Sequence, residues 1–127
     1  MQQIEVPEKL ADVASVPYDA SQKVAISIVV PVMNEEQSIQ TLYDKLSTQL
    51  NRIGSRYEII FVDDGSTDGT FRELKALHDE HPGVVRVIQF RRNFSKTPAL
   101  VAGFSRCRGD IIFTMDGDLQ DDPEEIP

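Results

Sequence analysis

Apolar residues in this chain follow two different spacings. Four short runs are rich in β-branched and aromatic residues, as expected for strands that are buried on both faces of a sheet. These runs are residues 26–33, 57–62, 84–90 and 111–115. The pattern predicts four strands separated by segments long enough to form helices.

The segments between the runs predict three helices. Apolar residues at intervals of three and four mark one helix that follows an N-cap at Asn34 and stops at Gly54. Its apolar face consists of Ile39, Leu42, Tyr43, Leu46, Leu50 and Ile53. A second, shorter helix ends before Pro82, and a third is expected to begin with Pro98 at its first position and to close near Gly109.

The order of these elements predicts an α/β fold. Strands that alternate with helices form a Rossmann-like parallel sheet, with right-handed crossovers and helices on both faces. In such sheets the ligand binds beyond the carboxyl ends of the strands. Residues 24–127 would form this unit, whereas residues 1–23 carry two prolines and no sustained period and are expected to be a flexible arm.

Composition excludes several classes of protein. The chain has 127 residues, of which 40% are hydrophobic, so it can bury a core without disulfides or structural metals. The single cysteine indicates a reducing compartment. A net charge of -8 argues against nucleic-acid binding. No apolar run reaches the roughly 18 residues of a membrane span, and the first 23 residues lack a signal-peptide stretch, so we expect a cytoplasmic location.

Charge is unevenly distributed along the second half of the chain. Residues 91–109 contain five basic residues and no acidic residue, whereas residues 110–127 contain seven acidic residues and no basic residue. Solvated surfaces usually mix the two signs. The separation fits either two ordinary surface stretches or one site that needs both charges.

Two carboxylates and two glycines follow the second predicted strand. Asp63 and Asp64 lead through Gly65 and Gly69 to the start of a helix. A carboxylate at this corner can accept hydrogen bonds from the base or ribose of a nucleotide, and the helix N-terminus favours anions nearby. The same residues also suit an ordinary capped turn, so the motif alone leaves both interpretations open.

Asp116, Asp118 and Gln120 follow the fourth predicted strand at alternate positions. In an extended segment such residues share one face, and two neighbouring carboxylates need a cation. Oxygen ligands suit Mg²⁺ or Mn²⁺. A calcium-binding EF-hand loop is excluded because Asp121 and Pro127 stand where that loop needs glycine and glutamate. The alternative is an acidic surface loop.

Three cations follow the third predicted strand: Arg91, Arg92 and Lys96. They would face the same edge of the sheet as the acids, and a metal-bound diphosphate would need both. The alternative is a solvated connector. The chain has no GxGxxG after its first strand and no GxxxxGK[ST], so neither a dinucleotide fingerprint nor a P-loop is present.

Two histidines and the cysteine are expected to be structural. His78 and His81 lie near a predicted helix C-terminus, where a cation complements the helix dipole. Cys107 is expected to pack as a small apolar side chain.

Four motifs in this order resemble the family 2 glycosyltransferases. They are IVVPVMNEE at 28–36, VDDGS at 62–66, RNFSK at 92–96 and MDGDLQDDPE at 115–124. Within the family, DxDLQ followed by Pro-Glu is most similar to the polyprenyl-phosphate branch, which contains dolichol-phosphate mannose synthase and bacterial enzymes that load glucose or modified arabinose onto undecaprenyl phosphate. The resemblance extends from about residue 25 to the end of the chain.

The resemblance implies a GT-A fold, of which this chain would be the nucleotide-binding half. It implies that Asp116 and Asp118 are catalytic and that a Mg²⁺ or Mn²⁺ cofactor is bound by Asp116, Asp118 and Gln120. The nucleotide contacts carried over by resemblance are Pro31, Met33, Glu35, Val62, Asp64 and Asp116. Two positions depart from the family pattern, since Met33 replaces a frequent tyrosine and Ser95 replaces a frequent glycine.

The function implied is a metal-dependent, inverting transfer of sugar from a UDP- or GDP-linked donor to a polyprenyl phosphate. The acceptor phosphate is already ionised at neutral pH, so no general base is required. One alternative is a family 2 transferase that makes a polysaccharide. Another is a truncated, non-catalytic domain that binds a nucleotide.

The end of the sequence carries a further expectation. Residues 122–125 have the composition of a helix start, yet the sequence stops at Pro127. We therefore expect this chain to be the amino-terminal part of a longer protein at the cytoplasmic face of the membrane, whose remaining part binds the acceptor. The 127-residue chain alone is expected to turn over no acceptor.

Overall fold

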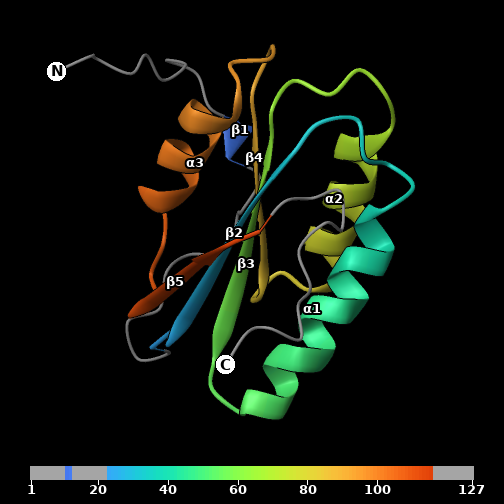
Figure 1. Ribbon diagram of the computed structural model, residues 1–127. Helices are drawn as coiled ribbons and strands as arrows, with labels where there is room; N and C mark the ends of the chain where they lie inside the picture. Colours follow the sequence, from blue (N-terminus) through green and yellow to red (C-terminus); the bar gives the residue numbers. More distant parts are fainter. Residues whose placement is uncertain (1–10, 13–22, 116–127) are drawn as a thin grey trace, which may run out of the picture.

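The computed structural model describes residues 11–12 and 23–115, which form one five-stranded sheet with helices on both faces (Figure 1). In chain order the elements are β1 (Ala11–Asp12), β2 (Ile26–Val32), α1 (Ile39–Ile53), β3 (Tyr57–Asp63), α2 (Thr70–Glu80), β4 (Val85–Gln89), α3 (Lys96–Phe104) and β5 (Ile111–Thr114). The order of the strands across the sheet is β1-β4-β3-β2-β5. The strands β2 to β5 run parallel, which confirms the predicted fold class.

The two faces of the sheet have separate cores. Helices α1 and α2 cover one face, where Ile28, Leu46, Phe61 and Leu74 are fully buried. Helix α3 covers the other face, over Val29, Ile60, Val62 and Ile88. These two cores are called the α1-side core and the α3-side core. Alternate residues of each strand therefore enter opposite cores, which explains why the strands are apolar throughout.

The helix boundaries differ from prediction at three points. The predicted N-cap at Asn34 is wrong, because residues 36–38 form a turn and α1 begins only at Ile39. The predicted stop at Gly54 is confirmed, with a left-handed backbone (φ +81°) and a hydrogen bond from its N–H to the Leu50 carbonyl. Helix α3 ends at Phe104 rather than near residue 109, and Pro98 is its third residue instead of its first.

Two residues of the expected flexible arm are paired with the sheet. Ala11 and Asp12 form β1, which lies antiparallel to β4 with Ala11 opposite Gln89. A short strand of this kind occupies main-chain groups that an edge strand leaves open. The other residues of the arm, apart from Lys23, lie outside the part of the chain that the structure describes.

The two histidines have structural contacts. His78 is buried, and its Nδ1 lies 2.7 Å from the carbonyl oxygen of Val85 at the start of β4. His81 ends α2 and stacks on Tyr43 of α1, with 4.8 Å between the ring centroids. Their role is thus structural, as predicted. It comes from contacts of α2 with β4 and α1 rather than from the predicted interaction with the helix dipole. Cys107 is half-buried against the α3-side core.

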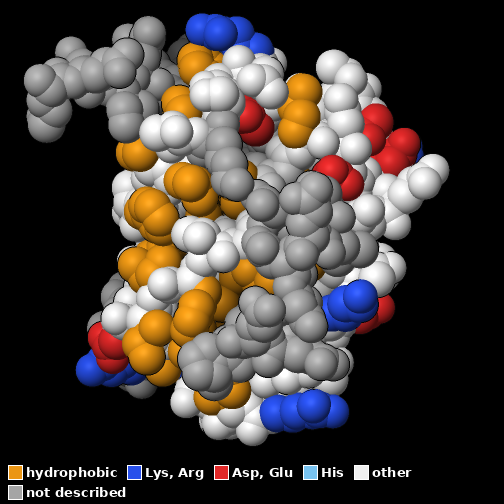
Figure 2. Space-filling view, viewed as in Figure 1, with side chains coloured by type: hydrophobic (Ala, Val, Ile, Leu, Met, Phe, Trp, Pro, Cys, Tyr) orange, Lys and Arg blue, Asp and Glu red, His pale blue; other side chains and the backbone are white. Residues whose placement is uncertain are grey.

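Apolar side chains remain exposed on one side of the molecule. Figure 2 shows them gathered where α3 and β5 lie, and Phe104, Ile111 and Ile112 are the large apolar residues exposed there. Among the described helices, none combines the length and the apolar character that a membrane crossing requires.

The close packing of α3 on β2 gives a testable prediction. A Cβ at Gly103 would lie 2.3 Å from Cγ1 of Val29, whose branched side chain is buried and stiff. Gly103→Ala should lower the free energy of unfolding by about 1–2 kcal/mol, because overpacking exceeds the gain in helix propensity. Gly83→Ala is the control, since no atom lies within 4 Å of its Cβ position. Urea unfolding that shows equal stability for both variants would contradict this packing.

Candidate functional site

The loops that follow β2, β3 and β4 meet at the carboxyl edge of the sheet. Pro31 is paired with Val62, and the next pair joins Val32 to Asp63. Because side chains alternate along a strand, Pro31, Met33, Val62 and Asp64 all belong to the α3 face. The structure thus brings four of the predicted nucleotide contacts together at one edge.

The loop after β2 is fastened to the loop after β3 by side-chain hydrogen bonds. Oδ1 of Asn34 accepts a hydrogen bond from the Thr67 N–H (2.8 Å), and the Asn34 N–H donates to Oγ of Ser66 (2.9 Å). The Glu35 N–H donates to Oγ1 of Thr70 (2.9 Å). Asn34 has a left-handed backbone (φ +53°), a conformation that asparagine tolerates well. These bonds make the two loops one unit, and Asn34 joins the loops where a helix cap was predicted.

Glu35 lies where the loop after β2 meets the starts of α1 and α2. Its main-chain N–H is held at the start of α2, and its residue lines a polar surface hollow of about 260 Å³ beside the start of α1. The other residues that line this hollow are Asn34, Glu36, Gln37, Ser38 and Asp68. Glu35 therefore stays a predicted contact that borders the site from the α1 side.

Asp63 and Asp64 point to opposite faces of the sheet, although they are adjacent. Asp63 is 1% exposed, its Oδ1 accepts a hydrogen bond from the Ser66 N–H (2.9 Å), and its Oδ2 has no hydrogen-bond partner. Burial raises the pKa of the Asp63 carboxyl above its ordinary value. The first aspartate of the motif is thus a structural part of the turn, whereas the second faces the α3 side.

Asp64 holds the loop that follows β4. Its Oδ1 accepts a hydrogen bond from the Phe94 N–H at 2.7 Å, and the residue is 5% exposed. Burial raises the pKa of Asp64, while hydrogen bonds from the Phe94 and Ser95 main chain act in the opposite direction. One carboxylate oxygen therefore anchors a neighbouring loop. Sequence reasoning missed this contact because it joins residues thirty positions apart with no pattern between them.

Residues 91–95 form a wall beside Asp64. A Cβ at Gly65 would lie 2.3 Å from the carbonyl carbon of Arg92 and 2.4 Å from the Asn93 nitrogen, so the wall packs directly on the Gly65 backbone. The Arg92 guanidinium lies 3.9 Å from the centre of the Phe94 ring. Arg91 and Arg92 are exposed. This loop is fixed on its inner side and presents cations to solvent on the outer side.

Met33 and Val62 have different surroundings. Met33 is 36% exposed, and Nδ2 of Asn93 lies 3.4 Å from its Sδ, so it joins the loop after β2 to the wall at 91–95. Val62 is fully buried in the α3-side core and supports the site from below.

The predicted catalytic and metal-binding residues, Asp116, Asp118 and Gln120, lie outside the described residues. Over residues 23–115, no group of three or more His, Cys, Asp or Glu side chains is arranged to hold a metal ion. The last described residue before them is Met115, whose N–H donates to the Val29 carbonyl (3.1 Å) at the end of β5.

The contact between Gly65 and the wall gives a second prediction. Gly65 and Gly54 both have left-handed backbones (φ +77° and +81°), but only Gly65 has atoms within 4 Å of its Cβ position. Gly54→Ala should cost about 1–2 kcal/mol from backbone strain alone. Gly65→Ala should cost more, and it should speed amide hydrogen exchange at Phe94 because residues 92–93 must move. Equal exchange at Phe94 in the two variants would contradict this account.

Comparison with known sequences adds the family context. A model of glycosyl transferase family 2 matches residues 27–127. The dodecaprenyl-phosphate galacturonate synthase of Rhizobium johnstonii is 41% identical over 109 residues, which are 86% of this chain and 32% of that protein. An undecaprenyl-phosphate 4-deoxy-4-formamido-L-arabinose transferase of Pseudomonas fluorescens is 44% identical over 103 residues, 80% of this chain and 30% of that protein.

Solved structures share the fold. The mannosyltransferase PcManGT of Pyrobaculum calidifontis, in complex with GDP-Man and Mn²⁺, has a TM-score of 0.67 at 24% identity and matches 82% of this chain and 30% of that chain. Glucosyl-3-phosphoglycerate synthase of Mycobacterium tuberculosis, in complex with Mn²⁺, UDP and glucosyl-3-phosphoglycerate, has a TM-score of 0.59 at 28% identity and matches 79% and 36% of the two chains. These neighbours are GT-A glycosyltransferases.

The chain spans about a third of the length of these curated relatives. The residues matched by the family model include the loops that follow β2, β3 and β4 as well as the acidic motif that follows β5 in the sequence. Since the family model covers most of the sequence, from the second residue of β2 to the end, this chain belongs to glycosyl transferase family 2.

Proposed function

We propose that the protein transfers a sugar from a UDP- or GDP-linked donor to a polyprenyl phosphate, at the cytoplasmic face of the membrane. The observation that carries this proposal is the 41–44% identity to relatives whose names contain dodecaprenyl-phosphate or undecaprenyl-phosphate. The donor class is supported by structural neighbours that hold GDP-Man or UDP.

The nucleotide would bind at the carboxyl edge of the sheet, on the α3 side. Asp64 accepts a hydrogen bond from the Phe94 N–H with Oδ1, and its Oδ2 would accept one from an N–H of uracil or guanine. Met33 would contact the base with its exposed side chain, and Pro31 and Glu35 would border the nucleotide. Val62 has a buried side chain, so it would support the surface on which the nucleotide lies.

Asp116, Asp118 and Gln120 would hold Mg²⁺ or Mn²⁺, and Asp116 would also lie next to the nucleotide. Two carboxylates and an amide oxygen suit these hard cations, and two of the structural neighbours contain Mn²⁺. When bound, such an ion neutralises charge that develops on the departing nucleoside diphosphate. In this sense Asp116 and Asp118 would be catalytic.

The acceptor phosphate would act directly as the nucleophile. A phosphate oxygen forms the new bond to the anomeric carbon, while the bond from that carbon to the nucleoside diphosphate breaks and takes its electron pair to the leaving group. Attack from the opposite side inverts the anomeric centre. Because the phosphate is already ionised, the scheme needs no proton acceptor among the side chains of this chain.

The transfer reaction is the first test of this proposal. The protein in its full coding length should convert undecaprenyl phosphate and one UDP- or GDP-sugar into a lipid-extractable product in the presence of Mn²⁺, and EDTA should abolish the product. Asp118→Ala should reduce the rate by at least about 100-fold through loss of charge stabilisation. Asp121→Ala, in the same acidic run, is the matched control and should keep most of the activity.

Other outcomes of this assay identify the two alternatives. A polymeric, water-soluble product would indicate a polysaccharide-forming transferase. Nucleotide binding without any sugar transfer would indicate a non-catalytic domain. Either result would overturn the proposed acceptor.

Asp64 allows a separate test of the nucleotide site. Asp64→Asn keeps an oxygen for the Phe94 N–H but replaces the second acceptor with a donor, whereas Asp64→Ala removes both. Each variant should weaken UDP or GDP binding by about 1.5–3 kcal/mol, the cost of losing a hydrogen bond to a charged group. Only Asp64→Ala should speed hydrogen exchange at the Phe94 amide.

The control for this experiment is Asp110→Asn, which changes an exposed carboxylate paired with Lys23. Isothermal titration of each folded variant with UDP and with GDP measures the effect. If Asp64→Asn binds both nucleotides as tightly as the unchanged protein, Asp64 serves only to hold the wall at 91–95.

A further inference from the structure

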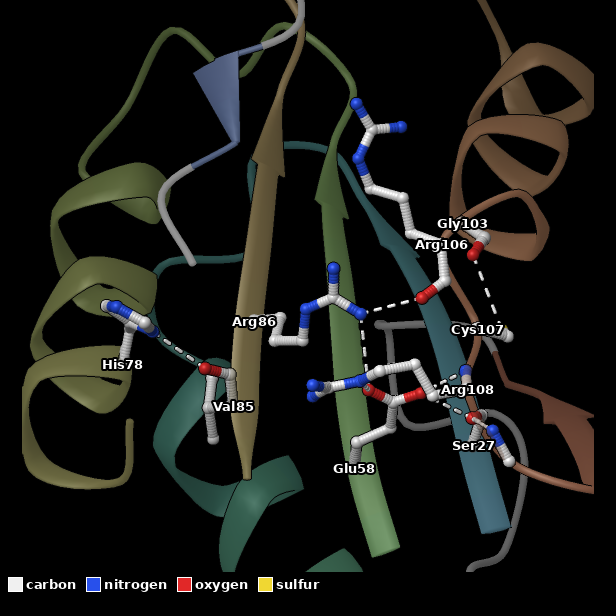
Figure 3. Close-up of polar contacts among 10 residues, drawn as sticks. Ser27, Glu58, His78, Val85, Arg86, Gly103, Arg106, Cys107 and Arg108 are labelled. Atoms are coloured by element: carbon white, nitrogen blue, oxygen red, sulfur yellow. Dashed lines mark hydrogen bonds and ion pairs between the residues drawn. The ribbon is translucent and has the colours of Figure 1, made fainter. Parts of the chain in front are cut away.

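A buried cluster of charged side chains lies on the α3 face of the sheet (Figure 3). At its centre is Glu58 of β3, which is fully buried. Its carboxylate accepts hydrogen bonds from Oγ of Ser27 (2.6 Å), from Nη1 of Arg86 (3.2 Å) and from both the main-chain N–H (2.7 Å) and Nε (3.0 Å) of Arg108. Three adjacent strands therefore contribute to the cluster together with the segment that follows α3.

The carboxylate of Glu58 is ionised in this cluster. Burial alone would raise the pKa of Glu58, but hydrogen bonds from Ser27 and Arg108 and the charge of Arg108 together hold this pKa below its ordinary value. The guanidinium groups of Arg86 and Arg108 are mostly buried, with side chains 15% and 22% exposed. The contacts are thus ion pairs in a poorly solvated place, where they are strong.

The cluster fastens the connector between α3 and β5. Nη1 of Arg86 donates to the Arg106 carbonyl oxygen (2.6 Å), Arg108 is bound to Glu58, and the Gly109 N–H donates to Oγ of Ser27 (2.8 Å). A Cβ at Gly109 would lie 2.7 Å from the Ser27 nitrogen. Residues 106–109 are therefore held at three successive points, immediately before β5 begins.

Strand β5 itself has few features that fix its register. It has four residues, and β2 is its one partner strand in the described part of the chain. Ile111, Ile112 and Thr114 are exposed. Among the side chains of residues 111–115, only those of Phe113 and Met115 are therefore buried in a way that favours one register of β5 against β2. A shift by two residues would keep every side chain on its face, and apolar burial penalises such a shift only weakly.

A buried ion pair is a poor source of net stability. Removing charges from water is costly, and apolar side chains of similar volume often replace such pairs with no loss of stability. What a buried pair does supply is specificity, and fixing a register is the best-attested use of buried polar groups. The position of this cluster at the entrance to a weakly specified strand fits that role.

We propose that Glu58, together with Arg86 and Arg108, is a positioning cluster that fixes the register of β5 against β2. A shift by one residue moves β5 by about 3.3 Å along β2. Such a movement would separate the donors and acceptors that join residues 106–109 to the cluster, because hydrogen bonds weaken steeply beyond their normal length. The residue that follows Met115 in the sequence is Asp116, so the register determines where the acidic motif starts. That last step rests on the proposed function, whereas the register itself does not.

Hydrogen exchange with peptide-level mass spectrometry tests the register. In the protein of full coding length, Glu58→Met/Arg108→Met replaces the Glu58–Arg108 ion pair with apolar side chains. Because it also takes the Glu58 carboxylate away from the mostly buried Arg86, it should lower the unfolding free energy, which is measured alongside exchange. The amides of residues 111–115 should exchange at least about tenfold faster than in the unchanged protein, while those of β3, which does not pair with β5, should not. Glu58→Gln is a second variant, expected to change β5 in the same direction.

Leu46→Ala is the control for simple destabilisation, because it removes a fully buried side chain from the α1-side core. It should speed exchange across the whole sheet in proportion to the lost stability, without singling out β5. If β5 in the double variant exchanges as slowly as in the unchanged protein, or only in step with global stability as in Leu46→Ala, the positioning role is wrong.

Nucleotide titration then tests the link to the site. The folded double variant should bind UDP or GDP at least about tenfold more weakly than the unchanged protein. Faster exchange in β5 with unchanged nucleotide affinity would overturn the link between the cluster and the site. If the unchanged protein binds neither nucleotide, the proposed function fails, and the exchange experiment still decides the register.

Discussion

The burial of β2 is the constraint on which the rest of the structure depends. It has β3 on one side and β5 on the other, and six of its seven residues are buried. A strand in this position must satisfy its main-chain groups through both neighbours and must be covered on both faces. Parallel neighbours require crossover helices, so α1 and α2 on one face and α3 on the other follow from the same requirement.

The carboxyl ends and the amino ends of the parallel strands have different chemistry. At the carboxyl edge, neutral and acidic side chains accept hydrogen bonds from main-chain N–H groups and join loops to one another, as Asn34 and Asp64 do. Toward the amino ends, Glu58 is surrounded by arginines and fastens a single connector. The carboxyl ends of the strands therefore hold exposed loops in a defined shape, whereas the Glu58 cluster holds residues 106–109 against the sheet.

Sequence patterns predicted the elements whose residues interact locally or alternate regularly. The parallel strands and the stop at Gly54 follow from burial on both faces and from a backbone conformation that favours glycine. The grouping of Met33 with Asp64 was implied by the family resemblance, and strand alternation, which places both on one face, accounts for it. The N-cap at Asn34 was wrong because the side chain has better partners in another loop, which no local pattern records. The partners of Glu58 and the pairing of β1 are hidden for the same reason.

The outer edge of β5 has a practical consequence. On the opposite edge of the sheet, β1 covers β4, but in the described part of the chain nothing pairs with the far side of β5. Exposed isoleucines beside open main-chain groups make such an edge a template for strands of other molecules. Mutual repulsion between chains of net charge -8 opposes this association, and salt screens the repulsion. Colloidal stability of the isolated chain should therefore decline as ionic strength rises, so low-salt buffers are the better choice for handling it.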